Sequence, residues 1–421
     1  MKNEFYGEFD FTRLKPSSRT NDYRTVFQID RDRIIHSSEF RRLQGKTQVF
    51  LPGESDYYRT RLTHSIEVAQ IGRSICNYLM HKKDSPFNDK YFIDPDLVES
   101  SCLAHDLGHP PFGHAGERTL NALMNEYGGF EGNAQTLRLL TEILYRSEND
   151  RRGMNPTRAF LDSILKYKYT YSELGKPGNH FIFDYQSEFI DFVFDGKQKG
   201  QKNIDLNNFR SIECQIMDWA DDTAYAINDI VDSISGGFIT YNGINRWIEQ
   251  NKNLLDDEEA GFVNQLKELI IKGNYKPKLG SIIGDFILAC SIEERETFMD
   301  DVTNRYKYVL KIDGKIKKQA ELYKKIAVDL VFTSPPLHQV EFKADEMITR
   351  MFEVFTGNYI INRKEIKLLP NFTHNLIVAE KSDTQKARLI CDYIAGMTDS
   401  FAMRVYKRLF DPDYSSLSDV D

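Results

Sequence analysis

Residues 103–117 read LAHDLGHPPFGHAGE and gather five metal-binding side chains around a turn rich in glycine and proline. These side chains are three imidazoles and two carboxylates: His105, His109, His114, Asp106 and Glu117. His105 and His109 are four residues apart, so they share a face if the stretch begins as a helix. The density of nitrogen and oxygen ligands predicts metal-binding chemistry at this point of the chain.

Pro110 and Pro111 mark a break inside this stretch. Proline lacks an amide hydrogen and its ring clashes with the preceding helical turn, so we expect the helix that carries His105 to end at these prolines. His114 and Glu117 are then expected in a turn or at the start of a new helix. The stretch therefore divides into two halves, one on each side of the break.

Two longer segments have a strong helical periodicity. Residues 62–81 bury one apolar side and carry His64 in the first turn. Residues 209–235 carry polar side chains at steps of three or four: Asp218, Asp221, Tyr225, Asp229 and Asp232. Because the opposite positions of this second helix are apolar, its acidic face can be pressed into the interior only where a cation lies beside it.

The composition is that of a folded soluble protein with a sizeable core, since 41% of the 421 residues are hydrophobic and 28% are charged. The net charge of −8 gives no general affinity for nucleic acid or acidic membranes. A local group of five basic residues between Arg41 and Arg61 nevertheless suggests a small anionic ligand.

The five cysteines form no CxxC pair and are expected to be reduced thiols of a cytoplasmic protein. The N-terminal residues lack the apolar core of a signal peptide, and no apolar run approaches the length of a membrane span. We therefore expect no membrane partner.

Apolar residues recur at helical spacing and strand-like alternation is rare, so the sequence predicts a mainly α protein with few or no strands. Besides the two segments above, helices are expected over residues 32–48, 94–107, 117–126, 134–146, 156–168, 256–271, 317–332 and 344–355. The stretch 170–210 is richer in glycine, proline and aromatic residues, and we expect irregular structure or an insertion there.

His64, the adjacent pair His105 and Asp106, and Asp221 are proposed as one metal site. Mixed imidazole and carboxylate ligands suit Mn, Fe, Zn or Mg, and so few protein ligands leave positions open for water and substrate. Each histidine alone reads more simply as an ordinary core or surface imidazole. The combination favours a metal site, and an open coordination site is what metal-assisted hydrolysis requires.

The order of these residues resembles the HD-domain phosphohydrolases, and in particular the deoxynucleoside triphosphate (dNTP) triphosphohydrolases related to bacterial dGTPase. The motifs that carry the resemblance span most of the chain: HDLGHPPFGHAGE (105–117), EFRRLQGKTQVF (39–50), RTRLTHSIEVAQIGRSI (59–75), FEGNAQTLRLL (130–140), DWADDTAYAINDIVD (218–232) and RLICDYIAGMTDSFA (388–402). We therefore expect an N-terminal arm (1–33), an HD-domain helical core (34–245) that contains the insertion, and a helical C-terminal extension packed on the core (246–421).

The resemblance also implies roles for individual residues. It implies metal ligands at His64, His105, Asp106 and Asp221, catalytic residues at His114, Glu117 and His109, and substrate contacts at Gln48, Arg61, Lys166, Tyr167, Tyr225 and Asp229. Arg61 falls on a phosphate-binding position, where a guanidinium can bind two oxygens at once. Gln48 and Asp229 fall on positions near the 3′-hydroxyl of the sugar. One segment departs from the family pattern: where the family often has a lysine, this chain reads GNHFIFDYQSE with His180.

The activity that the resemblance implies is hydrolysis of dNTPs to deoxynucleoside and tripolyphosphate, by water attack at the α-phosphorus. The cofactor is a divalent ion, Mn or Mg first, with Fe, Zn, Co or Ni as alternatives. Two other functions stay open: another HD-domain phosphohydrolase, such as a nucleotidase or phosphodiesterase, and a non-catalytic nucleotide-sensing protein. The family likeness further implies a homo-oligomer, a hexamer or tetramer, and regulation by a dNTP or single-stranded DNA.

Overall fold

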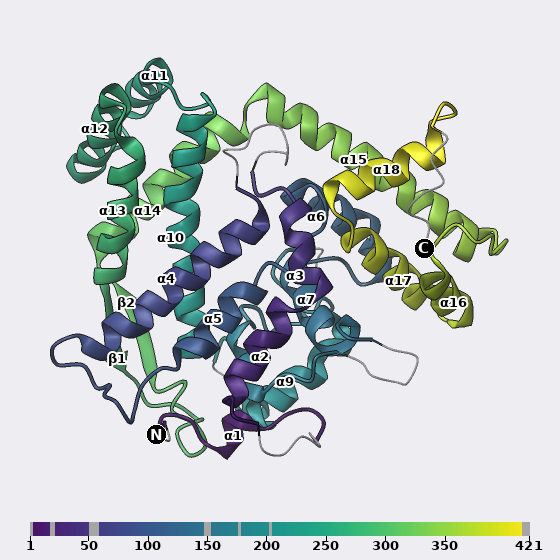
Figure 1. Cartoon of the computed structure of the whole chain (residues 1–421), viewed down its shortest axis with the longest axis horizontal. Helices are drawn as coiled ribbons and strands as arrows, with labels where there is room; N and C mark the ends of the chain where they lie inside the picture. The colour runs from purple at the N-terminus through teal and green to yellow at the C-terminus, as the bar shows by residue number, and fades with distance from the viewer. Residues whose placement is uncertain are drawn as a thin grey trace.

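The computed structural model describes residues 3–16, 22–49, 59–146, 153–175, 178–201 and 204–414. Within these ranges the chain is mainly α-helical, as predicted, and carries one two-stranded antiparallel sheet (Figure 1). The helices of the first half are α1 (Glu8–Phe11), α2 (Val26–Ile35), α3 (Ser38–Arg42), α4 (Arg61–His81), α5 (Pro95–Ala104), α6 (Gly113–Leu123), α7 (Gly132–Arg138), α8 (Arg158–Ser163), α9 (Ser187–Phe194) and α10 (Ile212–Ser235).

The second half continues with eight more helices and the sheet. The helices are α11 (Tyr241–Asn251), α12 (Asp257–Lys272), α13 (Tyr275–Leu288), α14 (Gly314–Ala327), α15 (Pro335–Thr356), α16 (Asn371–Ala379), α17 (Asp383–Ala395) and α18 (Asp399–Phe410). The strands are β1 (Cys290–Glu294) and β2 (Tyr308–Ile312), which pair between α13 and α14 in the chain. No helix in the part of the chain described here is long and apolar enough to cross a membrane.

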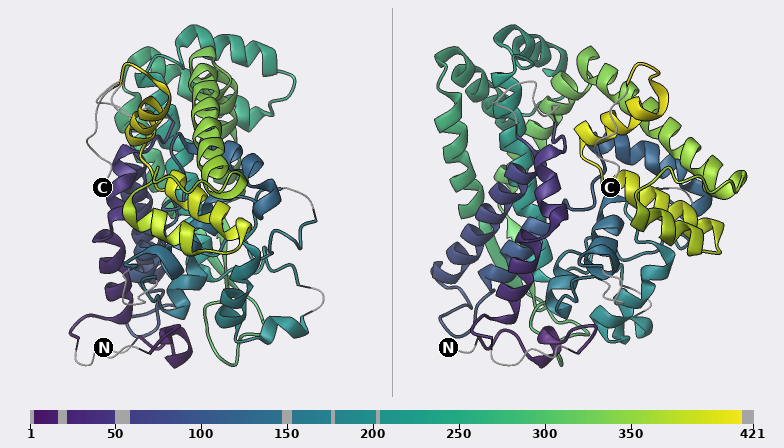
Figure 2. Two further views of the ribbon diagram at one scale, coloured as in Figure 1. Left: turned by 90° about the vertical axis from the view of Figure 1, so that its right-hand side faces the viewer. Right: turned by 45° about the vertical axis from the view of Figure 1, so that its right-hand side comes forward.

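Helices α4, α5 and α10 pack against one another at the centre of the main hydrophobic core. Helix α4 begins where Thr60 caps it, since the Thr60 hydroxyl accepts a hydrogen bond from the amide of Thr63. Helices α13 and α14 pack on α10, and Figures 1 and 2 show α11–α14 on one side of α4 and α10, with α15–α18 on the other. The central three helices thus form the frame on which the site is built.

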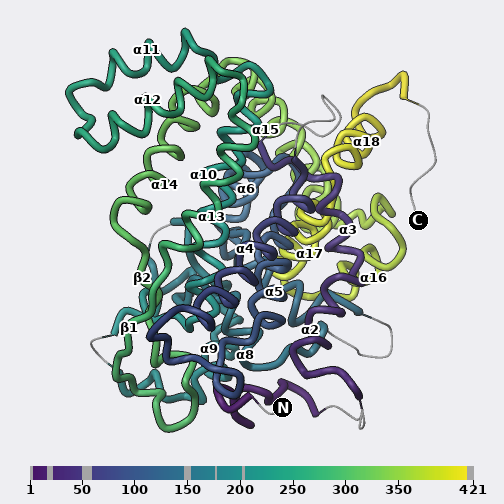
Figure 3. Tube along the Cα trace, turned by 60° about the vertical axis from the view of Figure 1, so that its left-hand side comes forward, coloured from purple at the N-terminus to yellow at the C-terminus, as the bar shows by residue number. Residues whose placement is uncertain are grey.

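A second hydrophobic core joins α6 to the C-terminal helices. Phe112, Ala115 and Leu120 pack with residues of α15, α17 and α18, although α6 is more than 200 residues away from α15 in the chain. In the trace of Figure 3, α17 and α18 lie beside the segment that contains α3. The C-terminal helices therefore contact the region of the chain that holds the histidine-rich stretch. The expected division at residues 33 and 245 stays a prediction.

Two helix boundaries differ from the sequence-based expectation. Residues 32–48 do not form one helix, because α2 ends at Ile35 and Ser37 caps α3 by accepting a hydrogen bond from the Phe40 amide at 3.1 Å. Residues 94–107 are helical only to Ala104, and residues 105–108 form a turn. The prolines at 110 and 111 therefore do not end this helix, and the prediction that His105 and His109 share a helical face is wrong.

Gly108 allows the turn after α5 to pack tightly on α7. A Cβ atom at Gly108 would lie 2.2 Å from the Gly132 carbonyl oxygen and 2.3 Å from the Thr136 amide nitrogen. The Gly108 amide also donates a hydrogen bond to the Thr136 hydroxyl at 2.9 Å. Any side chain at this position would push the turn away from α7, so the glycine fixes where His105, Asp106 and His109 lie.

The remaining predicted segments correspond to helices with shifted ends. Residues 134–146 correspond to α7 and the π-helical turn Leu139–Ile143, while residues 156–168 are helical only over α8. Residues 344–355 are the second half of the longer α15. The stretch 170–210, for which irregular structure was expected, contains α9 and two short 3-10 turns, Asp184–Gln186 and Lys197–Gly200.

Candidate functional site

Three of the predicted metal ligands converge from three different elements. His64 lies in the first turn of α4, His105 begins the turn after α5, and Asp221 lies on α10. Their ligand atoms are all within 4.8 Å of one another. His64 Nε2 and His105 Nε2 lie 3.0 Å and 3.4 Å from the same oxygen, Asp221 Oδ1.

Asp106 adds a fourth potential ligand, and a second carboxylate, to this group. Its Oδ1 atom lies 3.5 Å from His105 Nε2 and 3.0 Å from His109 Nδ1, while its Oδ2 atom accepts a hydrogen bond from Arg61 at 2.6 Å. Burial alone would raise the pKa of Asp106, but His109, His105 and Arg61 hold that pKa well below its usual range. The carboxylate is therefore ionised and able to bind a cation.

The hydrogen bonding of His105 fits a metal ligand. Its Nδ1 atom lies 2.6 Å from the Cys102 carbonyl oxygen, which can only accept, so Nδ1 carries a proton and the lone pair of the neutral ring lies on Nε2. That Nε2 atom is buried and has no hydrogen-bond partner, yet it faces the carboxylates of Asp106 and Asp221. A lone pair and two carboxylate oxygens pointed at one another are stabilised by a cation between them.

Lys166 lies beside the acidic face of α10. Its ammonium group lies 2.9 Å from Asp218 and 3.2 Å from Asp221, and burial, which would lower its pKa, is outweighed by these carboxylates, which raise it well above the usual value. Arg59 pairs with Asp232 further along the same helix. The acidic face thus lies beside cations, as its sequence pattern indicated.

The second half of the histidine-rich stretch begins α6. His114 Nδ1 lies 3.2 Å from Glu117 Oε2, and the other oxygen of Glu117 accepts a hydrogen bond from the Gly132 amide at 2.7 Å. Although burial would raise the pKa of Glu117, hydrogen bonding to His114 and the nearby His109 lower it to about 2. Glu117 is therefore an ionised carboxylate held on one side by backbone and on the other by the imidazole of the exposed His114.

One cavity of about 230 Å³ brings these groups together. All the predicted site residues except Asp229 line it: His64, His105, Asp106, Asp221, His109, His114, Glu117, Gln48, Arg61, Lys166, Tyr167 and Tyr225. Asp229 is buried one turn beyond Tyr225 on α10, where burial and then Asp232 raise its pKa well above the usual value. The cavity combines a metal-binding group with an imidazole–carboxylate pair and two buried cations.

Four residues of the cavity were not predicted as site residues: Glu131, Asn133, Asn179 and His180. Tyr167 stacks on His180 with ring centres 4.4 Å apart, and Asn179 lies next to that pair at the cavity wall. Burial and then the charge of Glu117 raise the pKa of Glu131 to about 8. The only sequence signal for Glu131 was its place in the FEGNAQ motif. The only signal for His180 was that the segment GNHF departs from the family pattern.

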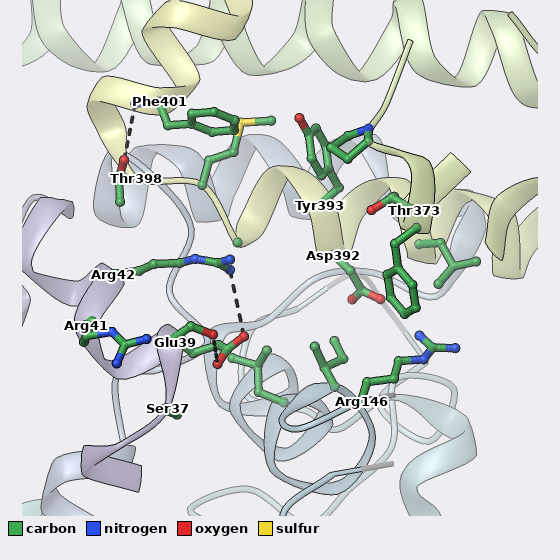
Figure 4. Close-up of a pocket in the computed structure, with 18 of the residues that line it drawn as sticks. Ser37, Glu39, Arg41, Arg42, Arg146, Thr373, Asp392, Tyr393, Thr398 and Phe401 are labelled. Atoms are coloured by element: carbon green, nitrogen blue, oxygen red, sulfur yellow. Dashed lines mark hydrogen bonds and ion pairs between the residues drawn. The ribbon is translucent and has the colours of Figure 1, made fainter. Parts of the chain in front are cut away.

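A larger cavity, of about 910 Å³, lies elsewhere, between α3, the π-helical turn 139–143 and α16–α18 (Figure 4). None of the predicted site residues lines this cavity. Arg41 and Arg42 do, so the basic group between Arg41 and Arg61 is divided between two places. Arg61 contributes to the smaller cavity, where the metal-binding residues are.

Comparisons with known proteins show which family the chain resembles. Residues 61–167 match the family described as HD domain, and residues 310–408 match the phosphohydrolase-associated domain. Proteins named deoxyguanosinetriphosphate triphosphohydrolase-like protein are similar over nearly the whole chain. Those of Shewanella sediminis, Shewanella halifaxensis and Shewanella pealeana are 36%, 35% and 34% identical, with 96% of each chain covered.

Proposed function

Because the chain belongs to the HD-domain phosphohydrolase family of deoxyguanosinetriphosphate triphosphohydrolase-like proteins, we propose that it hydrolyses dNTPs to deoxynucleoside and tripolyphosphate. The observation that carries the proposal is the single cavity that holds the metal-binding residues, the His114–Glu117 pair, Arg61 and Lys166. A triphosphate needs both a metal centre and several cations, and the cavity offers both.

On this proposal the metal ligands are His64, His105, Asp106 and Asp221. Two imidazoles and two carboxylates suit Mn or Mg first, with Fe, Zn, Co or Ni as alternatives. The chemistry that a divalent ion supplies when bound is Lewis-acid polarisation of the α-phosphate and a lowered pKa for an attacking water. Side chains of the protein carry out the remaining steps, which are proton transfer and the binding of phosphate and sugar.

His114 is the residue that moves a proton. The carboxylate of Glu117 accepts from His114 Nδ1, so Nε2 is left free to take a proton from water or give one to the leaving group. The backbone amide of Gly132 holds Glu117 in place for this task. His109 packs edge to face on His114, with ring centres 5.7 Å apart, and completes the wall of the cavity next to the metal ligands.

Arg61 and Lys166 offset the negative charge of the triphosphate. Both are buried beside carboxylates of the metal site, Arg61 on Asp106 and Lys166 on Asp221. Phosphate oxygens that enter the cavity take up part of this positive charge. We therefore propose two roles for each cation. Before substrate binds, it pairs with a carboxylate of the metal site, and after substrate binds, it also pairs with phosphate oxygens.

Gln48 and Asp229 are proposed to contact the sugar near its 3′-hydroxyl. Tyr225 is proposed to pack close to the triphosphate and sugar, and Tyr167 to lie near the phosphates. The side-chain oxygen of Gln48 and Oδ2 of Asp229 are buried and lack hydrogen-bond partners among the described residues. Buried acceptors without partners are costly, and a sugar hydroxyl satisfies such an acceptor. Assembly into a tetramer or hexamer, and regulation by a dNTP or single-stranded DNA, stay predictions from the family.

A substrate panel tests the proposed function. Purified protein is incubated with each dNTP and each ribonucleoside triphosphate in Mn or Mg, and the products are separated by ion-exchange chromatography. We expect deoxynucleoside and intact tripolyphosphate, and no product after chelation. Release of pyrophosphate with monophosphate would point to a different HD-domain phosphohydrolase, and no turnover of any nucleotide would favour a nucleotide-sensing protein.

A further inference from the structure

The two halves of the site belong to two different hydrophobic cores. The metal-binding residues lie on α4, on α10 and after α5, which are packed in the main core. His114 and Glu117 lie on α6, whose apolar side is packed in the second core with α15, α17 and α18. The spacing between the two halves therefore depends on contacts that join the cores.

Asp399, the first residue of α18, makes such a contact with two separate segments of the site. Its Oδ2 atom accepts hydrogen bonds from the amide and the hydroxyl of Thr47, the amide at 2.8 Å. Its Oδ1 atom accepts a hydrogen bond from the amide of Phe112 at 2.9 Å. Thr47 directly precedes Gln48, and Phe112 is the residue on which α6 begins, two positions before His114.

The geometry around Phe112 needs this support. Phe112 has a φ of 63° and Gly113 a φ of 59°, so the chain turns through the left-handed region just before α6. A bulky residue in that region is strained and persists only where its surroundings hold it. The carboxylate of Asp399 is 2% exposed and accepts the Phe112 amide, so it stabilises the turn that aims His114 and Glu117 into the cavity.

Independent contacts bring the same segments together. A Cβ atom at Gly45 would lie 2.9 Å from Cγ2 of Thr398, so a glycine is required for this close approach. The buried side-chain nitrogen of Lys46, Nζ, donates to the carbonyl oxygen of His109 at 2.5 Å and to that of Ala395 at 2.9 Å. Residues 45–47 are thus held on the α17–α18 junction from both ends.

We propose that Asp399 is a positioning residue, through which α18 fixes the Gln48 segment and the start of α6 relative to the metal-binding residues. The inference rests on the proposed function, because Gln48 is there a substrate contact and His114 and Glu117 are the proton-transfer pair. It assigns to the C-terminal helices a direct part in shaping the site. Asp399 itself does not line the cavity.

The test compares Asp399→Asn with a matched control, Asp383→Asn. Asparagine has the shape of aspartate but only one acceptor oxygen, so either Thr47 or Phe112 loses its partner. Asp383 is likewise the first residue of its helix, α17, but its carboxylate pairs with Arg363 at the surface. We expect Asp399→Asn to lower kcat/KM by about 10- to 100-fold through misplacement of the site segments, and Asp383→Asn to change it less than about twofold.

Hydrogen exchange gives a readout that does not depend on catalysis. Peptides that cover residues 44–49 and 109–118 are expected to exchange faster in Asp399→Asn than in the natural protein, while exchange in α4 and Mn affinity stay unchanged. Thr47→Val, which removes only the hydroxyl, should weaken kcat/KM less than Asp399→Asn does. Thr47→Ser, which keeps the hydroxyl, should restore it.

Four results would overturn the inference. The first is an Asp399→Asn variant with kcat and KM within about twofold of the natural protein. The second is a parallel loss of melting temperature and protection in α4, which would mean a general scaffold role. If the natural protein hydrolyses no dNTP, the proposed function fails, and hydrogen exchange then tests the positioning role by itself. In that case, unchanged protection of residues 44–49 and 109–118 in Asp399→Asn rejects the positioning role. If Asp399→Asn does not fold, the two Thr47 variants replace it in the test. Equal activity and equal hydrogen exchange in Thr47→Val and Thr47→Ser would then reject the positioning role.

Discussion

Arg61 and Asp106 form a buried ion pair at the centre of the site, in which Arg61 Nη1 lies 2.6 Å from Asp106 Oδ2. The side chains are 2% and 7% exposed. The family resemblance assigned the two residues to separate tasks, Arg61 to phosphate binding and Asp106 to metal binding. Their contact couples those tasks, because any change at one residue alters the charge that surrounds the other.

Arg61→Lys tests the role of the guanidinium. Lysine keeps the charge but is a single point donor, so it cannot bind Asp106 and a phosphate oxygen through separate nitrogens. We expect kcat/KM for the preferred dNTP to fall about 10- to 100-fold. Arg73→Lys on the same helix is the control, since Arg73 pairs with Asp96 and Glu99 away from the cavity. Equal effects of the two substitutions would contradict a specific role for Arg61.

Asp106→Asn tests the metal site. The amide oxygen can still accept from Arg61, whereas Asp106→Ala would leave that guanidinium buried without its partner and cost about 3–5 kcal/mol of stability. We therefore expect Asp106→Asn to stay folded, to bind Mn at least about tenfold more weakly and to lose nearly all hydrolysis. Calorimetric titration with Mn measures the affinity, and circular dichroism confirms the fold. Undiminished Mn affinity would remove Asp106 from the ligand set.

Glu117→Gln tests the proton-transfer pair. Its oxygen can accept from the Gly132 amide, but the amide nitrogen then faces His114 Nδ1 and favours the opposite tautomer. We expect kcat to fall by about 10²- to 10⁴-fold while KM and Mn affinity change little. Steady-state kinetics at saturating metal measure the effect. A variant with altered KM and natural kcat would instead indicate that Glu117 contributes to substrate binding.

The fold class and the grouping of the four proposed metal ligands were predictable from local patterns and side-chain chemistry, whereas the other residues of the cavity were expected only from the family resemblance. Helical spacing predicted α4 and α10, and the paired patterns of histidine and aspartate predicted residues that do line one cavity. The break before α6 was predicted for the wrong reason. The helix ends at Ala104 because the following turn packs on α7 through Gly108, a contact that no local pattern reveals.

Long-range partners could not be predicted from the sequence. Thr47 and Asp399 are 352 residues apart, and nothing in either segment signals that the two would meet. Lys166 was assigned to phosphate, yet its carboxylate partners on α10 depend on how α10 packs beside the segment after α8. His180 lines the cavity with its ring stacked on Tyr167, a contact that the sequence does not signal. Such pairings follow from the packing of helices, which single-sequence periodicity does not determine.

Lys46 gives the protein a predictable dependence of stability on pH. Burial, then the charges of Arg61 and Arg42, lower the pKa of Lys46 from 10.5 to about 7, against the opposing influence of Asp399 and Glu39. Between pH 7 and 10.5 the unfolded chain therefore holds a proton on this lysine that the folded protein has released. Because the unfolded state binds more protons, the free energy of unfolding contributed by this residue rises with pH across that window.

Lys46→Met removes this contribution, and urea unfolding at pH 7, 8 and 9 measures it. The variant is less stable at every pH because two buried carbonyl groups, those of His109 and Ala395, lose their donor. The difference in unfolding free energy between the natural protein and the variant should widen as pH rises, by about 1 kcal/mol or more per pH unit within the window. Lys272→Met, at an exposed lysine that pairs with Glu268, should leave the pH dependence unchanged. A difference that stays constant from pH 7 to 9 would mean that folded Lys46 keeps its proton, and that its two carbonyl contacts hold a charged ammonium group.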